Sequence, residues 1–186
     1  MDLSKLNIKQ GLCISLGANI NSQFGSPIDS LIKSRYEIEK IIKKLINTSQ
    51  KVKVEDNQLK DFFKWSSLYR TKPLGITKSQ PDYINCLLLS NGPFLPNATT
   101  EKAKYLLNEL KNLEKEFGRN KSLEVERWLP RTLDLDIIWW DNLSVNDEEL
   151  IIPHPRFKLR NFVITPLSEI LSTSQEIEKL NIKSWK

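Results

Sequence analysis

The chain has 186 residues, which fits one ordinary domain and leaves little room for a second. Hydrophobic residues make up 39% and charged residues 27% of the sequence, which provides enough core-forming side chains to exclude global disorder. Lys and Arg number 28 against 23 Asp and Glu, and the resulting net charge of +5 suits a polyanionic small molecule as well as a nucleic acid.

The first two predicted elements are a strand and a long helix. The apolar segment GLCISLGANI predicts a strand that ends at Gly17, and turn residues follow it. From Pro27, apolar residues recur at spacings of three and four, which predicts a helix to about residue 46. The polar segment over residues 48–61 predicts a connecting loop, to which we assign no function.

Two strands, a second helix and a further strand follow. Residues 62–71 and 83–92 have the composition of strands, and the loop of about eleven residues between them is long enough to favour a functional role. Residues 99–118 predict a helix, with threonines at its start and Gly118 at its end. The alternation in TLDLDIIWW predicts a strand over residues 132–140.

The remaining segments are shorter. After a turn at Asp141 and Asn142, the sequence predicts an extended segment over residues 149–157, a short apolar segment over residues 162–167 and a tail without structural signal. The order β-α-β-β-α-β predicts an α+β fold in which helices pack on one face of a mainly antiparallel sheet.

Cysteine and histidine content restricts the chemistry of the protein. Cys13 and Cys86 lie in apolar stretches, which favours buried free thiols and a reducing compartment. His154 is the single histidine, so HExxH zinc sites are excluded and any metal is held mainly by oxygen. The amino-terminal segment lacks a signal sequence and no stretch approaches membrane-spanning length, which predicts a soluble cytoplasmic protein without a membrane partner.

The acidic pair Asp134 and Asp136 is the most specific chemical feature. Residues two apart in a strand face the same way, so the two carboxylates project together while the intervening leucine faces the opposite side. Magnesium prefers carboxylate oxygens combined with substrate phosphates and water. The alternative is a solvated strand face, but basic residues gather on both sides of the pair: Arg119, Lys121, Arg127, Arg131, His154, Arg156, Lys158 and Arg160. Interleaved acids and arginines indicate a nucleotide-phosphate site.

A second group consists of aromatic residues and one amide. Tyr83, Trp128 and Phe162 offer faces for a planar heterocycle, and Asn85 offers a donor and an acceptor for its edge. The alternative is that Tyr83 and Phe162 are core aromatics. No glycine-rich phosphate loop of the GxxxxGK[ST] or GxGxxG type occurs, so side chains and metal must hold the phosphates.

Four segments together carry a family resemblance: RWLPRTLDLDIIWW, SSLYRTKPLG, QPDYINCLLL and IIPHPRFKLRNFVITPL. They resemble the 6-hydroxymethyl-7,8-dihydropterin pyrophosphokinases from about residue 12 to about residue 170. The resemblance implies Mg²⁺-dependent transfer of pyrophosphate from ATP to the hydroxymethyl group of the pterin, giving AMP, in folate biosynthesis. It also implies a monomer with a ferredoxin-like α+β sandwich and a single pyrophosphokinase domain over residues 1–186.

The resemblance further implies roles for individual residues. Asp134 and Asp136 match the pair that holds two magnesium ions, and Arg119 and Arg131 match catalytic arginines on the ATP phosphates. Nucleotide-binding residues are implied at Glu114, Lys121, Arg131, His154 and Arg160. Pterin-binding residues are implied at Thr71, Leu74, Tyr83, Asn85, Trp128 and Phe162.

Two alternative functions remain open from the residues. A nucleotidyltransferase that uses the same acidic pair would release pyrophosphate instead of AMP. A ferredoxin-like RNA-binding module would stack bases on the sheet aromatics, but the chain lacks an RNP1-like pattern and its acidic pair would repel phosphates without metal. We therefore expect small-molecule substrates and no nucleic-acid partner.

Overall fold

The fold is built on a five-stranded antiparallel sheet with three helices. The computed structural model describes residues 10–50, 53–59, 61–73, 79–119 and 129–172. Its strands are β1 Leu12–Ala18, β2 Phe63–Trp65, β3 Tyr69–Thr71, β4 Tyr83–Ser90, β5 Asp134–Trp140, β6 Val145–Asn146 and β7 Ile151–Ile152. Its helices are α1 Pro27–Gln50, α2 Thr100–Glu116 and α3 Asn161–Leu171, with short 3-10 turns η2 Asp56–Leu59 and η4 Phe157–Leu159. The predicted α+β class is confirmed.

The sheet has the strand order β2-β4-β1-β5, and β3 also pairs with β4. All of these pairings are antiparallel, as the sequence predicts. β1 lies at the centre and all of its residues are buried, which is expected for a strand that is covered on both faces. β6 and β7 form a separate two-stranded ribbon.

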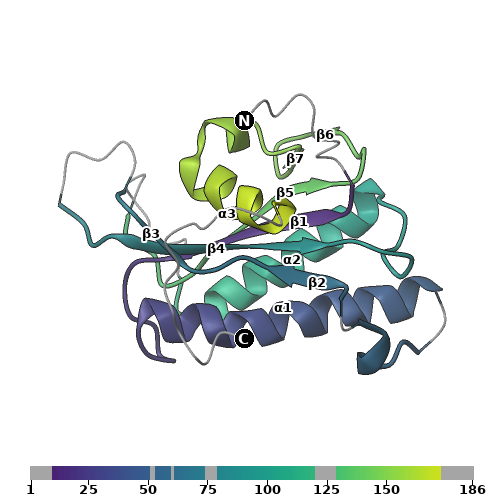
Figure 1. The fold of residues 1–186 in the computed structure, drawn as a ribbon, viewed down its shortest axis with the longest axis horizontal. Helices are drawn as coiled ribbons and strands as arrows, with labels where there is room; N and C mark the ends of the chain where they lie inside the picture. Colours follow the sequence, from purple (N-terminus) through teal and green to yellow (C-terminus); the bar gives the residue numbers. More distant parts are fainter. Residues whose placement is uncertain (1–9, 51–52, 60, 74–78, 120–128, 173–186) are drawn as a thin grey trace.

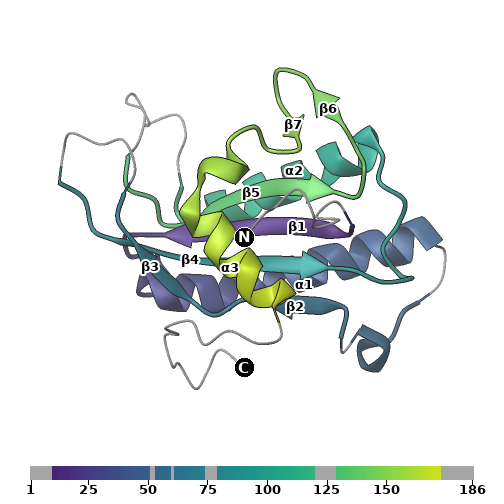
Figure 2. The same ribbon diagram turned by 45° about the horizontal axis from the view of Figure 1, so that its top comes forward.

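The two faces of the sheet carry different helices. Leu12, Ile14 and Leu16 point toward the larger core, which includes residues of α1 and α2. Cys13 points the other way, into a smaller core with Val163 of α3, because side chains alternate along a strand. α1 and α2 therefore lie on one side of the sheet and α3 on the other (Figure 1), and a turned view shows α3 crossing the strands (Figure 2). The prediction that the helices share one face is correct for α1 and α2 only.

α3 is the one helix of the described residues that the sequence did not predict. Its first turns contain Val163, Ile164 and Thr165, which are β-branched, and Pro166 lies inside it. These residues make a helix hard to recognise in the sequence, although apolar residues follow helical spacing at Val163, Pro166, Leu167 and Ile170. Val163, Leu167 and Ile170 pack on the sheet. Contact with the sheet outweighs weak helix propensity here.

The single strand predicted over residues 62–71 is split into β2 and β3. Trp65 is opposite Leu88 of β4, whereas Tyr69 is opposite Asn85. Between these two pairs, the chain advances by four residues from β2 to β3 but by only three residues along β4. The extra residue makes a bulge. The hydroxyl of Ser66 accepts a hydrogen bond from the backbone N–H of Leu87 at 3.0 Å, which satisfies a group that a regular ladder would pair with backbone.

The predicted helix boundaries hold for α1 and α2 within a few residues. Thr99 caps α2 by accepting a hydrogen bond from the backbone N–H of Lys102, and Gly118, with φ of 91°, follows the last turn. Cys13 and Cys86 are free and buried, as expected. Within the described ranges, no helix combines the length and the apolar character that crossing a bilayer requires.

Candidate active site

The candidate site lies on the sheet face that carries α3. Gly17 of β1 is paired with Asn85 of β4 on one side and with Asp134 of β5 on the other, so these three positions form one row across the sheet. Ser15 is likewise opposite Asp136. Cross-strand partners point to the same face. The pairing therefore brings the amide of β4 and the two carboxylates of β5 onto one surface.

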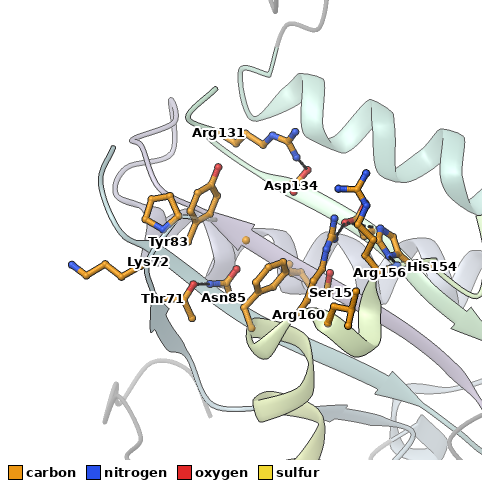
Figure 3. Close-up of a pocket in the computed structure, with 16 residues that line it drawn as sticks. Ser15, Thr71, Lys72, Tyr83, Asn85, Arg131, Asp134, His154, Arg156 and Arg160 are labelled. Carbon is orange, nitrogen blue, oxygen red and sulfur yellow. Dashed lines mark hydrogen bonds and ion pairs between the residues drawn. The ribbon is translucent and has the colours of Figure 1, made fainter. Parts of the chain in front are cut away.

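A cavity of about 500 Å³ opens at this surface, beside the amino-terminal end of α3. Figure 3 shows its polar side chains converging from β3, β4, β5 and the segment before α3. It is lined by nine of the residues predicted for the site: Thr71, Tyr83, Asn85, Arg131, Asp134, Asp136, His154, Arg160 and Phe162. The shared face of the two carboxylates is as predicted, because Leu135 between them is buried in the opposite core.

Asp134 is held by two arginines. Arg119 Nη1 lies 2.8 Å from Asp134 Oδ1, and Arg131 Nη1 lies 2.5 Å from the same oxygen. Arg119 is also paired with Glu114, which is buried in α2 at 3% exposure. The carboxylate of Glu114 accepts a second hydrogen bond from the backbone N–H of Leu135 at 2.9 Å. Glu114 thus ties α2, Arg119 and β5 together behind the cavity.

Asp136 faces a second basic group. Arg160 Nη1 lies 3.0 Å from Asp136 Oδ2, and His154 Nε2 lies 3.9 Å from it. Burial lowers the pKa of His154, the carboxylate of Asp136 opposes this, and the positive charge of Arg160 lowers the pKa further. His154 Nδ1 accepts the backbone N–H of Arg156 at 3.2 Å, which is consistent with a neutral ring that carries its proton on Nε2.

The other end of the cavity is less charged. Asn85 is 4% exposed, and its amide Nδ2 donates to Thr71 Oγ1 at 2.8 Å. Tyr83 and Phe162 are each half-buried and line the cavity, so neither is fully enclosed in the core. The guanidinium of Arg160 lies 5.4 Å from the centre of the Phe162 ring, at the junction of the two ends.

The donor set at the charged end fits a magnesium ion that is shared with a phosphate ligand. Over the part of the chain that the structure describes, no group of three or more His, Cys, Asp and Glu side chains could hold a metal ion. Asp134 and Asp136 supply two carboxylates, and magnesium commonly takes one or two carboxylates and completes its shell with water and phosphate oxygens. The arginines on both carboxylates offer forks that match phosphate oxygens.

Among the positions that sequence reasoning missed, three lie in or just after β1. Gly17 and Ser15 line the cavity, and Asn19 lies just beyond β1 at 3% exposure. A Cβ at Gly17 would lie 2.8 Å from Asn85 Oδ1, so only glycine leaves room for the amide. The available signals were a polar residue inside the buried pattern of β1 and the Gly-Ala-Asn segment at its end. Leu74, Lys121 and Trp128, which the resemblance assigns to the site, lie outside the described residues.

The cavity thus has arginines and carboxylates at one end, and an amide with two aromatic rings at the other. Comparison with known proteins identifies the family to which the chain belongs. The family model of 7,8-dihydro-6-hydroxymethylpterin-pyrophosphokinase matches residues 13–172. The 2-amino-4-hydroxy-6-hydroxymethyldihydropteridine pyrophosphokinase of Haemophilus influenzae is 36% identical over 159 residues, which cover 86% of this chain and 80% of that protein.

Two further relatives agree. The protein of the same name from Bacillus subtilis is 35% identical over 132 residues, which cover 66% of this chain and 71% of that protein. The folate synthesis bifunctional protein of Arabidopsis thaliana is 39% identical over 108 residues, 58% of this chain and 20% of that protein. The chain belongs to the 7,8-dihydro-6-hydroxymethylpterin-pyrophosphokinase family and is an ATP-dependent pyrophosphokinase of folate biosynthesis.

Proposed function

We propose that the chain transfers pyrophosphate from ATP to the hydroxymethyl oxygen of 6-hydroxymethyl-7,8-dihydropterin and releases AMP, in a magnesium-dependent reaction. The observation that supports this best is the division of one cavity into a charged half, with Asp134 and Asp136, and an aromatic and amide half, with Tyr83 and Asn85. The first half suits a polyphosphate and the second suits a planar heterocycle.

In the charged half, we propose that Arg119, Arg131 and Arg160 bind the phosphates of ATP. Each lies within hydrogen-bonding distance of a carboxylate, so each is already aimed at the charged centre. His154 is proposed to donate from Nε2 to the nucleotide. Glu114 is buried and paired with Arg119, so its proposed role in nucleotide binding is indirect and acts through the orientation of that guanidinium.

Asp134 and Asp136 are proposed to hold two magnesium ions together with the ATP phosphates. Bound magnesium would neutralise charge on the oxygens of the transferred group. The two carboxylates also keep Arg119, Arg131 and Arg160 oriented before ligands bind. When phosphates enter, the guanidinium groups gain new acceptors at the positions where negative charge accumulates.

In the aromatic half, Tyr83 and Phe162 are proposed to stack on the two faces of the pterin, and Asn85 to read its edge. Thr71 accepts a hydrogen bond from the amide nitrogen of Asn85, which fixes the orientation of the amide. The amide oxygen is then available to accept a hydrogen bond from a ring N–H. The ring is then held while the hydroxymethyl oxygen attacks the β-phosphorus of ATP and AMP leaves. Positioning and electrostatics supply the acceleration, and we assign no general base.

Product analysis tests this function against its alternatives. AMP is measured with ATP, hydroxymethyldihydropterin and magnesium present together, and then with each one omitted. We expect AMP in the complete mixture only. Release of pyrophosphate would favour a nucleotidyltransferase, and RNA binding without turnover of ATP would favour an RNA-binding module.

Removing either aromatic ring is expected to weaken pterin binding much more than ATP binding. Stacking on one face of a base-sized ring contributes about 1–3 kcal/mol, so Phe162→Ala and Tyr83→Ala should each lower pterin affinity by up to about a hundredfold. Calorimetric titration of each ligand alone measures the difference. Tyr36→Ala serves as the control because Tyr36 lies on α1, on the opposite side of the sheet, and is 54% exposed. Equal losses for both ligands would identify the rings as core.

Gly17→Ala is expected to lower pterin affinity by about tenfold, the effect of losing roughly one hydrogen bond, while the protein stays folded. The new methyl would lie 2.8 Å from Asn85 Oδ1 and 3.6 Å from Tyr83 Cδ1, so the amide must move. A double-mutant cycle identifies the cause. In an Asn85→Ala background, Gly17→Ala should cost little further affinity, whereas full additivity would show that the methyl acts elsewhere.

The finer architecture is also proposed. When β2 and β3 are counted as one interrupted strand, the order from β1 to β5 is β-α-β-β-α-β. This order and the antiparallel arrangement β2-β4-β1-β5 support a ferredoxin-like sandwich, to which α3 and the β6–β7 ribbon are additions. We further propose a single domain over residues 1–186 that acts as a cytoplasmic monomer without a nucleic-acid partner. Light scattering with and without ligands tests the monomer.

A further inference from the structure

Asn19 is a buried polar residue that touches both segments flanking the cavity. Its amide Nδ2 donates to Gln80 Oε1 at 3.3 Å and to the carbonyl oxygen of Pro81 at 3.2 Å. Its Oδ1 accepts the backbone N–H of Arg131 at 2.7 Å. The orientation of this amide is set by chemistry, because a backbone N–H can only donate and a carbonyl oxygen can only accept.

The two segments lead into opposite halves of the cavity. Gln80 and Pro81 lie just before β4, which begins at Tyr83 after one intervening residue. Arg131 comes before β5, and its guanidinium lies 2.5 Å from the carboxylate of Asp134. The backbone N–H of Asn19 donates to the carbonyl oxygen of Arg131 at 2.9 Å, so the contact with this segment is double. One side chain at the end of β1 therefore contacts the chain just before the aromatic half and just before the charged half.

We propose that Asn19 is a positioning residue that fixes the aromatic half of the cavity relative to the charged half. This role rests on the proposed function, in which a ring held by Tyr83 must present its oxygen to a phosphate held beside Asp134. Reacting atoms must approach to about 3–3.5 Å, and a misplacement of about 1 Å can lower the rate about a hundredfold. Asn19 is not itself among the residues that line the cavity, so it acts through its hydrogen bonds to the backbone of Arg131, to Gln80 and to Pro81.

The chemistry of the contact calls for a short amide. The segment with Arg131 requires an acceptor and the segment with Pro81 requires a donor, and asparagine supplies both on one side chain. Aspartate keeps the acceptor and loses the donor, whereas leucine has a similar size and loses both. Asn19→Asp therefore removes the hydrogen bonds that Asn19 donates to Gln80 and Pro81, and Asn19→Leu also removes the one that it accepts from Arg131.

The test compares turnover with ligand affinity. We expect Asn19→Asp to lower kcat by about tenfold to a hundredfold, while the Kd of each ligand alone, measured with a nonhydrolysable ATP analogue and with hydroxymethylpterin, changes by less than about threefold. Asn19→Leu should lower kcat further. If Asn19→Leu does not fold, Asn19→Asp carries the test. Gln80→Glu is the matched control, because it adds a charge at the same contact and leaves the amide of Asn19 with both acceptors; we expect a smaller loss of kcat than in Asn19→Asp.

Three results would overturn the positioning role. The first is an unchanged kcat in Asn19→Asp, and the second is an equal loss in Gln80→Glu, which would assign the effect to charge. The third is a parallel loss of kcat, both affinities and thermal stability, which would make Asn19 a general structural residue. The wild-type protein is assayed first for AMP. Absence of AMP there would refute the proposed function and this role with it, whereas AMP formation with an unaffected Asn19→Asp refutes the positioning role alone.

Discussion

Asp134→Asn and Asp136→Asn are each expected to lower turnover about a thousandfold or more at saturating magnesium, a loss of about 4 kcal/mol in transition-state stabilisation. Each substitution removes a negative charge that the proposed magnesium site requires. It also weakens the ion pairs that orient guanidinium groups, those of Arg119 and Arg131 at Asp134 and that of Arg160 at Asp136. Single-turnover kinetics at increasing magnesium concentration measures the loss and shows whether more metal restores it.

The control for these variants is Asp61→Asn, because Asp61 is exposed and lies just before β2, away from the cavity lining. It makes the same chemical change at a position where the structure gives the carboxylate no role in the site. Turnover should stay near the wild-type value in this variant. Turnover within a few-fold of wild type in Asp134→Asn or Asp136→Asn would instead show that the metal is held elsewhere.

Glu114→Ala is expected to be the most destabilising of the single changes considered, by about 3 kcal/mol. It leaves the backbone N–H of Leu135 without its acceptor and removes a carboxylate that is paired with buried Arg119 beside that of Asp134. For a domain of this size the unfolding midpoint should fall by about 6–12 °C. Differential scanning calorimetry measures this, and turnover should also fall because Arg119 loses its fixed orientation.

Two further variants test why Glu114→Ala should lower the stability of the protein. Glu114→Gln keeps an oxygen for Leu135 and loses the charge opposite Arg119, so its midpoint should lie between those of wild type and Glu114→Ala. Glu109→Ala removes a partly exposed acid from the same helix, 3.7 Å from Lys44, and should cost less than about 1 kcal/mol. Similar unfolding midpoints for Glu109→Ala and Glu114→Ala would contradict the stabilising role that we assign to the buried carboxylate of Glu114.

Local patterns made much of the fold predictable. The alternation of TLDLDIIWW indicates both the strand and the common face of Asp134 and Asp136, because that relation depends only on residues two apart. The caps and periodicity of α2 are equally local. α3 was missed because its β-branched start and Pro166 oppose helix formation, and its stability comes from packing against β1 and β4, which no local pattern reports.

Long-range contacts explain what the sequence did not reveal about the site. Asn19 meets Gln80 and Arg131, which are 61 and 112 residues away along the chain. Nothing near Asn19 in the sequence indicates either partner. The crowding of Gly17 against Asn85 likewise depends on the register between β1 and β4. Residue types identified the chemistry of the cavity, whereas the register of the sheet determines which supporting residues hold it in place.

The pterin product of the reaction gives the most direct test of the central claim. After incubation with ATP and magnesium, hydroxymethyldihydropterin is separated and its mass determined, and the nucleotide product is identified in the same sample. The proposed function predicts a pterin that has gained two phosphoryl groups, together with an equal amount of AMP. A pterin with one added phosphoryl group together with ADP, or an unchanged pterin with ATP consumed, would contradict it.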